Sequence, residues 1–300
     1  MRTTSALILV LTLLPVAACA KSDGGAQSRA RTQTSRSVAS GLERQKADAR
    51  KAEAETPDLS AYFKRFPGTF VLYDLKNDRY VRHDAARAAQ RFPPYSTFKI
   101  PNSLIGVESG VIKDADFLIK WDAKKYPPYG EVAPFSSWWR DQTLRTAFKR
   151  SALWYYQELA ERVGAEKMKE YVDKLNYGNR DTSGGLTRFW LNSTLRISAD
   201  EQVEFLKALY REQLPVSKRT FGIVKEIMVL EETPAYKLSA KTGGGPLGEG
   251  KALGWFVGYL ETKGNTYFFA TQIEGPNFLA IRDERINITK GILKDLGHMN

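Results

Sequence analysis

The sequence predicts an α/β fold of the α+β kind, in which an antiparallel sheet is built from both termini of the domain, is flanked by helices and carries an all-helical insertion. Two observations predict it. Aromatic and β-branched residues are concentrated near residues 68–83 and again at 238–273, as in strands. Between residues 114 and 205 the apolar residues recur instead at the spacing of helices.

The strands are expected in two groups. Residues 68–74 and 80–83 form a hairpin around a polar turn. Residues 238–243 form a strand that leads into a glycine-rich loop. Residues 253–260 and 266–273 form the next two strands, joined by a Gly-Asn turn.

The helices are expected mainly between these groups. Residues 143–163 form the clearest one, a single continuous helix that ends at a glycine. Residues 166–175 form another, and Ser198 caps a third that runs to Tyr210, with a glutamate at the capping-box position. Residues 286–296 form a closing helix.

The N-terminal region predicts export. Residues 1–18 have a short basic start and an apolar run too short to span a bilayer, as in a secretion signal. The run ends in Val-Ala-Ala-Cys, which resembles a bacterial lipoprotein box. We therefore expect lipidation of Cys19 and anchoring on the periplasmic side of a bacterial membrane; ordinary signal cleavage, with Cys19 incidental, is the alternative. Residues 19–56 lack aromatics and predict a flexible tether, and residues 57–300 the folded domain.

Composition excludes several classes of function. The net charge is +11 at pH 7, but the basic residues are scattered among acidic ones, so we expect a generally basic surface and no nucleic-acid partner. Cys19 is the only cysteine and the chain has two histidines. The mature domain therefore has no internal disulfide, thiolate zinc site or cysteine nucleophile, and we expect no metal. The sequence leaves the oligomeric state open.

Ser96 and Lys99 lie at the expected start of a helix, directly after Pro93 and Pro94. A lysine at i+3 lies on the same helical face as the serine, one turn along. A serine needs a group that removes its proton, and histidine, the usual base, occurs only at distant positions. Burial lowers the pKa of a lysine and would make its amine such a base. The spacing alone is common, so the other parts of a site have to be found.

Three further fragments follow in order along the chain: Ser151-Ala152-Leu153, Tyr177-Gly178-Asn179 and Lys241-Thr242-Gly243. The first lies on the helix expected over residues 143–163. The second forms a turn that ends a helix, and we interpret Tyr177 and Asn179 as framework. The third ends a strand. Each fragment alone has an ordinary structural explanation.

Together these fragments resemble the penicillin-recognising serine enzymes, which combine Ser-x-x-Lys with a later Lys-Thr-Gly. The chain is most similar to the class D, or oxacillinase-type, β-lactamases. Those enzymes also carry Phe-Trp-Leu, here residues 189–191, and Trp-Phe-Val-Gly-Tyr, here residues 255–259. The resemblance covers residues 59–296 and implies a hydrolase that acts on the cyclic amide of β-lactam antibiotics.

The resemblance implies a role for each catalytic residue. Ser96 attacks the β-lactam and forms an acyl-enzyme. Lys99, carbamylated by CO2 or bicarbonate, is the general base, with no metal or organic cofactor. The indole of Trp190 helps to hold the carbamate, and Ser151 passes a proton to the lactam nitrogen. Leu153 stands near the carbamate where the family usually has valine.

The implied substrate-binding residues are Lys241, Thr242, Gly243, Gly244 and Arg285. The lysine supplies positive potential, while Thr242 and Arg285 bind the substrate carboxylate; Arg282 is the alternative arginine. The backbone N–H groups of Ser96 and Gly244 form the oxyanion hole. Gly244 replaces a residue that is commonly bulkier, which would widen the pocket or loosen the loop.

Two other functions fit the same motifs. A penicillin sensor is acylated in the same way but does not turn over; such domains normally follow membrane spans and a zinc protease segment. A peptidoglycan D,D-peptidase would favour Ser-x-Asn as the second motif, where this chain has Ser-Ala-Leu.

Overall fold

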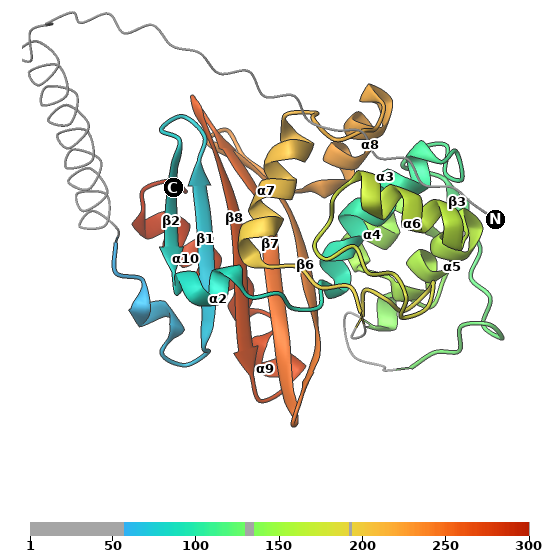
Figure 1. Ribbon diagram of the computed structural model, residues 1–300, viewed down its shortest axis with the longest axis horizontal. Helices are drawn as coiled ribbons and strands as arrows, with labels where there is room; N and C mark the ends of the chain where they lie inside the picture. Colours follow the sequence, from blue (N-terminus) through green and yellow to red (C-terminus); the bar gives the residue numbers. More distant parts are fainter. Residues whose placement is uncertain (1–56, 130–134, 192–193, 300) are drawn as a thin grey trace, which may run out of the picture. The chain divides into compact units, whose positions relative to one another are not determined.

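A six-stranded antiparallel sheet forms the centre of the domain, with the strands in the order β2-β1-β8-β7-β6-β5 (Figure 1). The computed structural model describes residues 57–129, 135–191 and 194–299. The strands of the sheet are β1 (Gly68–Asp74), β2 (Arg79–His83), β5 (Val229–Glu232), β6 (Tyr236–Gly248), β7 (Lys251–Thr262) and β8 (Asn265–Gly275). Because β1 pairs with β8, the sheet is made from both ends of the domain, as predicted.

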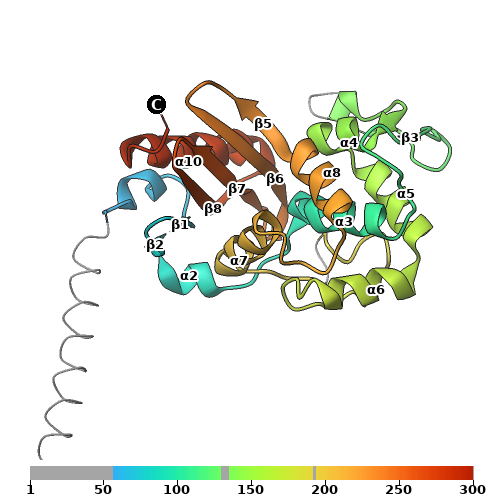
Figure 2. The ribbon, with the colours of Figure 1, turned by 90° about the horizontal axis from the view of Figure 1, so that it is seen from above.

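The two faces of the sheet pack against different helices. In β7, Trp255, Val257 and Tyr259 belong to the core under the helical insertion. Their neighbours Phe256 and Leu260 belong to a second core on the opposite face, because successive residues of a strand point to opposite sides. Figure 2 shows α7 (Ala199–Tyr210) and α10 (Glu284–Asp295) on these two faces.

The insertion between β2 and β5 is largely helical, as expected. The other helical elements are η1 (Ser60–Phe63), α2 (Ala85–Ala89), η2 (Tyr95–Phe98), α3 (Lys99–Glu108), η3 (Phe135–Ser137), α4 (Leu144–Arg150), α5 (Leu153–Val163), α6 (Ala165–Lys174), α8 (Lys218–Met228) and α9 (Phe278–Ile281). A small separate pair of strands, β3 (Leu118–Ile119) and β4 (Gln142–Thr143), lies within it. The Ser198 capping box at the start of α7 is present.

The prediction of one continuous helix over residues 143–163 is wrong. The helix stops at Ser151, whose backbone is left-handed with φ 58°, and α5 starts two residues later. In an unbroken helix the Arg150 carbonyl would accept from the N–H of Trp154. It accepts instead from the indole N–H of Trp138, at 2.8 Å. The side chain of Trp138, which lies outside the predicted helix, therefore supports the break at Ser151.

Three other elements differ from expectation. The glycine run after Gly243 is not a loop, because β6 continues through it to Gly248 and pairs with β7 along this length. α8 and β5 were not predicted, although Phe221 and Val224 in α8 bury their side chains at helical spacing.

The signal segment, the lipidation site and the tether, residues 1–56, lie outside the described residues. Within the described ranges, no helix combines the length and the apolar character needed to cross a membrane.

Candidate active site

Ser96 lies on the 3-10 turn η2, which leads directly into α3. The turn is stabilised at its start, where Pro94 accepts from both the N–H and the hydroxyl of Thr97, at 3.1 and 2.7 Å. It packs against β6 at Gly243, where an added Cβ would lie 2.8 Å from the Pro94 carbonyl oxygen. The glycine therefore allows the strand to approach the turn that carries Ser96.

Lys99 is placed as a base for Ser96. Its Nζ lies 2.9 Å from Ser96 Oγ, and the residue is only 1% exposed. Burial lowers the pKa of Lys99 to about 7, because removal from water disfavours the charged ammonium. A large part of the lysine is therefore an uncharged amine near neutral pH, and that form accepts a proton.

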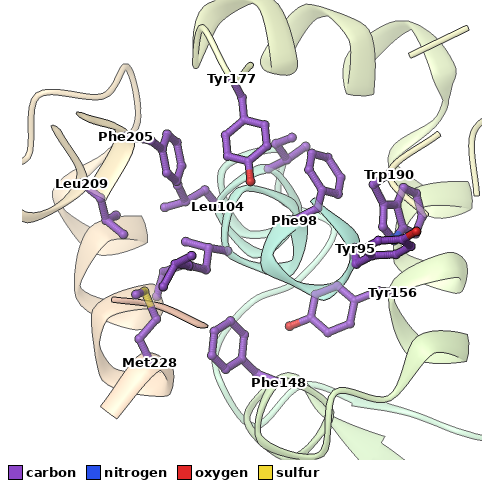
Figure 3. Packing of buried hydrophobic residues seen from close by; sticks show 14 of the residues in the cluster. Tyr95, Phe98, Leu104, Phe148, Tyr156, Tyr177, Trp190, Phe205, Leu209 and Met228 are labelled. Carbon is purple, nitrogen blue, oxygen red and sulfur yellow. The ribbon is translucent and has the colours of Figure 1, made fainter. Parts of the chain in front are cut away.

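Aromatic side chains gather around the start of α3, where Lys99 is buried. Lys99 Nζ lies 5.1 Å from the centre of the Tyr156 ring. The fully buried Trp190 stacks on Phe98, with ring centres 5.4 Å apart, and Figure 3 shows Phe98, Trp190 and Tyr156 around the start of α3. The Tyr156 ring helps to keep water from the lysine, and this burial is the cause of its lowered pKa.

Ser151 and Lys241 meet from opposite sides of the site. Ser151 occupies the break between α4 and α5, while Lys241 lies in β6, and their Oγ and Nζ atoms are 3.0 Å apart. Lys241 also donates to the carbonyl of Thr242 at 2.9 Å. Its pKa is lowered, first by burial and then by the nearby cations Lys99 and Arg285. The break at Ser151 therefore brings its hydroxyl to the amine of Lys241. The predicted continuous helix did not include this break.

Arg285 reaches the same strand from α10. It is 5% exposed and donates from Nη1 to the carbonyl of Gly243. Its Nε is buried and has no hydrogen-bond partner among the described residues. Burial lowers the pKa of Arg285 to about 10. Arg282 also lines the cleft but pairs with Asp283 at 3.0 Å.

Gly244 lies beside this arginine. A Cβ at this position would lie 2.7 Å from Arg285 Nη1 and 2.8 Å from Phe278 Cε2. The space of a larger side chain is thus taken by the arginine and the aromatic ring. The expected widening of the pocket by Gly244 is offset by these neighbours.

The other residues singled out in the sequence, Leu153, Tyr177 and Asn179, are not among those that line the cleft. Leu153, the first residue of α5, is half-buried against the core. Tyr177 is buried and bonds to Gln202 at 3.4 Å, while the amide of Asn179 donates to the Thr194 carbonyl at 2.8 Å. Both contacts hold loops in place.

The site opens into a cleft of about 910 Å³. Its lining includes Ser96, Ser151, Thr242, Gly243, Gly244 and Arg285. Three aromatic residues that the motifs did not identify as site residues, Phe135, Trp138 and Phe278, also line it. The pairing of Trp138 with the Arg150 carbonyl depends on the folded helices, so no local sequence signal identifies it. The described residues contain no group of three or more His, Cys, Asp or Glu placed to hold a metal ion.

Comparison with known proteins agrees with this geometry. Residues 68–297 match the family described as penicillin binding protein transpeptidase domain. The crystal structure of a class D β-lactamase, YbXI from Nostoc, superposes with a TM-score of 0.74 at 39% identity, covering 80% of this chain and 98% of that one. The chain belongs to the class D β-lactamases.

Curated proteins similar to this class D β-lactamase include two β-lactamases and a longer resistance protein. The probable β-lactamase YbxI of Bacillus subtilis is 43% identical over 235 residues, 78% of this chain and 83% of the relative. β-Lactamase OXA-10 of Pseudomonas aeruginosa is 42% identical over 212 residues, 70% of this chain and 77% of the relative. The methicillin resistance mecR1 protein of Staphylococcus aureus is 35% identical over 238 residues, which are 79% of this chain and 39% of that protein.

Proposed function

We propose that this chain hydrolyses β-lactam antibiotics through an acyl-enzyme on Ser96. The observation that carries the proposal is the buried Lys99 amine 2.9 Å from Ser96 Oγ, with its pKa lowered to about 7. A base with a pKa near the working pH combines the correct protonation state with a useful driving force for proton transfer.

Acylation uses both serines. Ser96 Oγ bonds to the lactam carbonyl carbon, its proton goes to the base at Lys99, and the carbon–nitrogen bond of the ring breaks. The lactam nitrogen takes a proton from Ser151, and the Ser151 oxygen recovers a proton from Lys241, whose Nζ lies 3.0 Å away. The backbone N–H groups of Ser96 and Gly244 stabilise the negative charge on the carbonyl oxygen, an effect typically worth ~2.7–4 kcal/mol per donor.

The substrate carboxylate is bound by the middle of β6. Thr242 and Arg285 line the cleft, and the buried Lys241 directly precedes Thr242 in the strand. An arginine whose Nε is buried without a partner gains most from an anionic ligand, because burial penalises an unpaired donor. A carboxylate beside the lactam ring supplies that charge.

Carbamylation of Lys99 is the finer part of the proposal. An uncharged amine is the form that reacts with CO2, and burial produces this form near neutral pH. When formed, the carbamate supplies an anionic oxygen base in place of the amine. It would take the Ser96 proton in acylation and then remove a proton from the water that breaks the acyl–Ser96 ester, with the proton returned to Ser96. The carbamate would favour the charged form of the nearby Lys241, and this ammonium together with the indole of the buried Trp190 would hold the negative charge.

The deciding experiment is turnover of a chromogenic cephalosporin with and without added bicarbonate. We expect steady hydrolysis that increases with bicarbonate after the protein has been degassed at low pH. Ser96→Ala is the control and should show neither turnover nor covalent labelling. A single stoichiometric burst with no steady state would contradict hydrolysis.

The penicillin sensor that shares these motifs is the second candidate, a domain that is acylated and keeps the acyl group. The same experiment separates the two functions, because a sensor gives the burst alone. Intact-protein mass spectrometry after the burst then shows whether the adduct remains on Ser96.

A further inference from the structure

Tyr95, the residue directly before Ser96, has an unusual backbone. Its φ is 50°, in the left-handed region, and it is only 3% exposed. A bulky side chain disfavours this backbone conformation, which such a residue keeps only when its surroundings hold it.

Three separate contacts hold Tyr95. Its N–H donates to the carbonyl of Trp190 at 2.9 Å. Its hydroxyl donates to the carbonyl of Pro246 in β6. Its ring packs on Gly245, where an added Cβ would lie 2.7 Å from Cδ1 and closer still to Cε1. Burial raises the pKa of Tyr95 to about 12, so the hydroxyl remains a donor at ordinary pH.

These contacts join the two chain segments that would form the oxyanion hole. One donor belongs to Ser96, which follows Tyr95. The other belongs to Gly244, which precedes the two residues that Tyr95 contacts in β6. An oxyanion hole acts only if its two N–H groups are correctly spaced before the reaction begins. The ring and hydroxyl of Tyr95 fix the separation of η2 from this part of β6.

We propose that Tyr95 is a positioning residue that sets the spacing between the backbone N–H groups of Ser96 and Gly244, through its ring on Gly245 and its hydroxyl on Pro246. The inference rests on the proposed acylation of Ser96. It also assigns Gly245 a function, because no other residue leaves room for the ring.

The test measures acylation by a fluorescent penicillin in a stopped-flow instrument, per active site. Varying the penicillin separates the maximal acylation rate from the affinity of the initial complex. Tyr95→Phe removes only the hydroxyl and should slow acylation roughly two- to tenfold, the value of one hydrogen bond, with the affinity unchanged. Gly245→Ala should slow it roughly a hundredfold, as loss of an oxyanion donor does.

A double variant provides the decisive comparison. Tyr95→Ala/Gly245→Ala removes the ring that the new methyl group meets, so it should react faster than Gly245→Ala alone. Gly222→Ala in α8, where an added Cβ meets nothing within 4 Å, is the control for glycine replacement. Tyr236→Phe, at the other end of β6, is the control for loss of a hydroxyl.

Each outcome decides a different question. Gly245→Ala with the acylation rate of the wild type, or a double variant slower than Gly245→Ala, would overturn the positioning role. The positioning role would also be overturned if the variants lower only the thermal midpoint and the fraction of sites that react, with the acylation rate per active site unchanged. If the fluorescent penicillin fails to label the wild-type protein, the proposed function is overturned instead.

Discussion

Lys241 donates a hydrogen bond to Ser151 at 3.0 Å, across the boundary between the sheet and the helical insertion. The two residues are 90 positions apart in the sequence. Because the lysine occupies a lone pair of the serine oxygen, the hydroxyl hydrogen of Ser151 remains available to the cleft. This arrangement supports the proposed role of Ser151 in delivering a proton to the leaving group.

Ser151→Ala should lower the rate of β-lactam hydrolysis roughly 10²- to 10⁴-fold, the usual contribution of a positioned acid or base. Ser151→Gly is the matched variant, since it also lacks the hydroxyl but suits the left-handed backbone at φ 58°. We expect it to be as inactive as the alanine variant while unfolding at a higher temperature. Activity restored by glycine would show that backbone strain, rather than the hydroxyl, governs the rate.

Lys99 should make stability depend on pH. Its pKa is about 7 in the folded protein and 10.5 in the ordinary state, so between these values the unfolded chain binds more protons. The free energy of unfolding therefore rises with pH from about 7 to 10.5, and the penalty for burying the ammonium is fully present below pH 7.

Lys99→Met should remove this dependence. We expect it to raise the free energy of unfolding by up to a few kcal/mol below pH 7, with the gain falling towards zero near pH 10.5. Urea unfolding in CO2-free buffer at several pH values measures this. A gain that is the same at pH 6 and pH 10 would contradict a lowered pKa, whatever the packing of the methionine.

The sequence was sufficient to predict the sheet built from both ends, because strand patterns and the 264–265 turn are local. It also contained the site motifs, which the fold brings together at Ser96, Ser151 and β6. It could not predict the break at Ser151, since the Trp138 indole that supports it comes from another segment.

The role of the glycines at 243–245 could not be predicted from the sequence for a similar reason. Consecutive glycines usually mark a loop, but here they form a strand against which other groups pack closely. Gly243 meets the turn of Ser96, Gly244 meets Arg285, and Gly245 meets Tyr95. Only the positions of these partners, all distant in sequence, explain why a strand has no side chains there.

Cys19 is proposed as the lipid-anchoring residue of the exported protein. Mass spectrometry of the membrane fraction should find an N-terminus that carries a diacylglyceryl group on this cysteine. Cys19→Ser should release the protein in soluble form with unchanged activity in solution, because the residue lies outside the domain that holds the site. A wild-type product that is soluble and begins at Lys21 would contradict lipidation.

Arg285 and Arg282 provide a direct comparison of the two cleft arginines. Arg285→Met keeps the apolar stem but removes the charge behind β6, and should raise KM for penicillins roughly tenfold to a hundredfold, as expected for a hydrogen bond to a charged group. Arg282→Met should have a smaller effect, because Arg282 is half-buried at the rim and pairs with Asp283. Arg285→Met should have the larger effect on KM for every penicillin, since the carboxylate is common to all of them. A larger effect at Arg282 would assign the carboxylate to the rim and leave Arg285, with its donor to the Gly243 carbonyl, as a support for the strand.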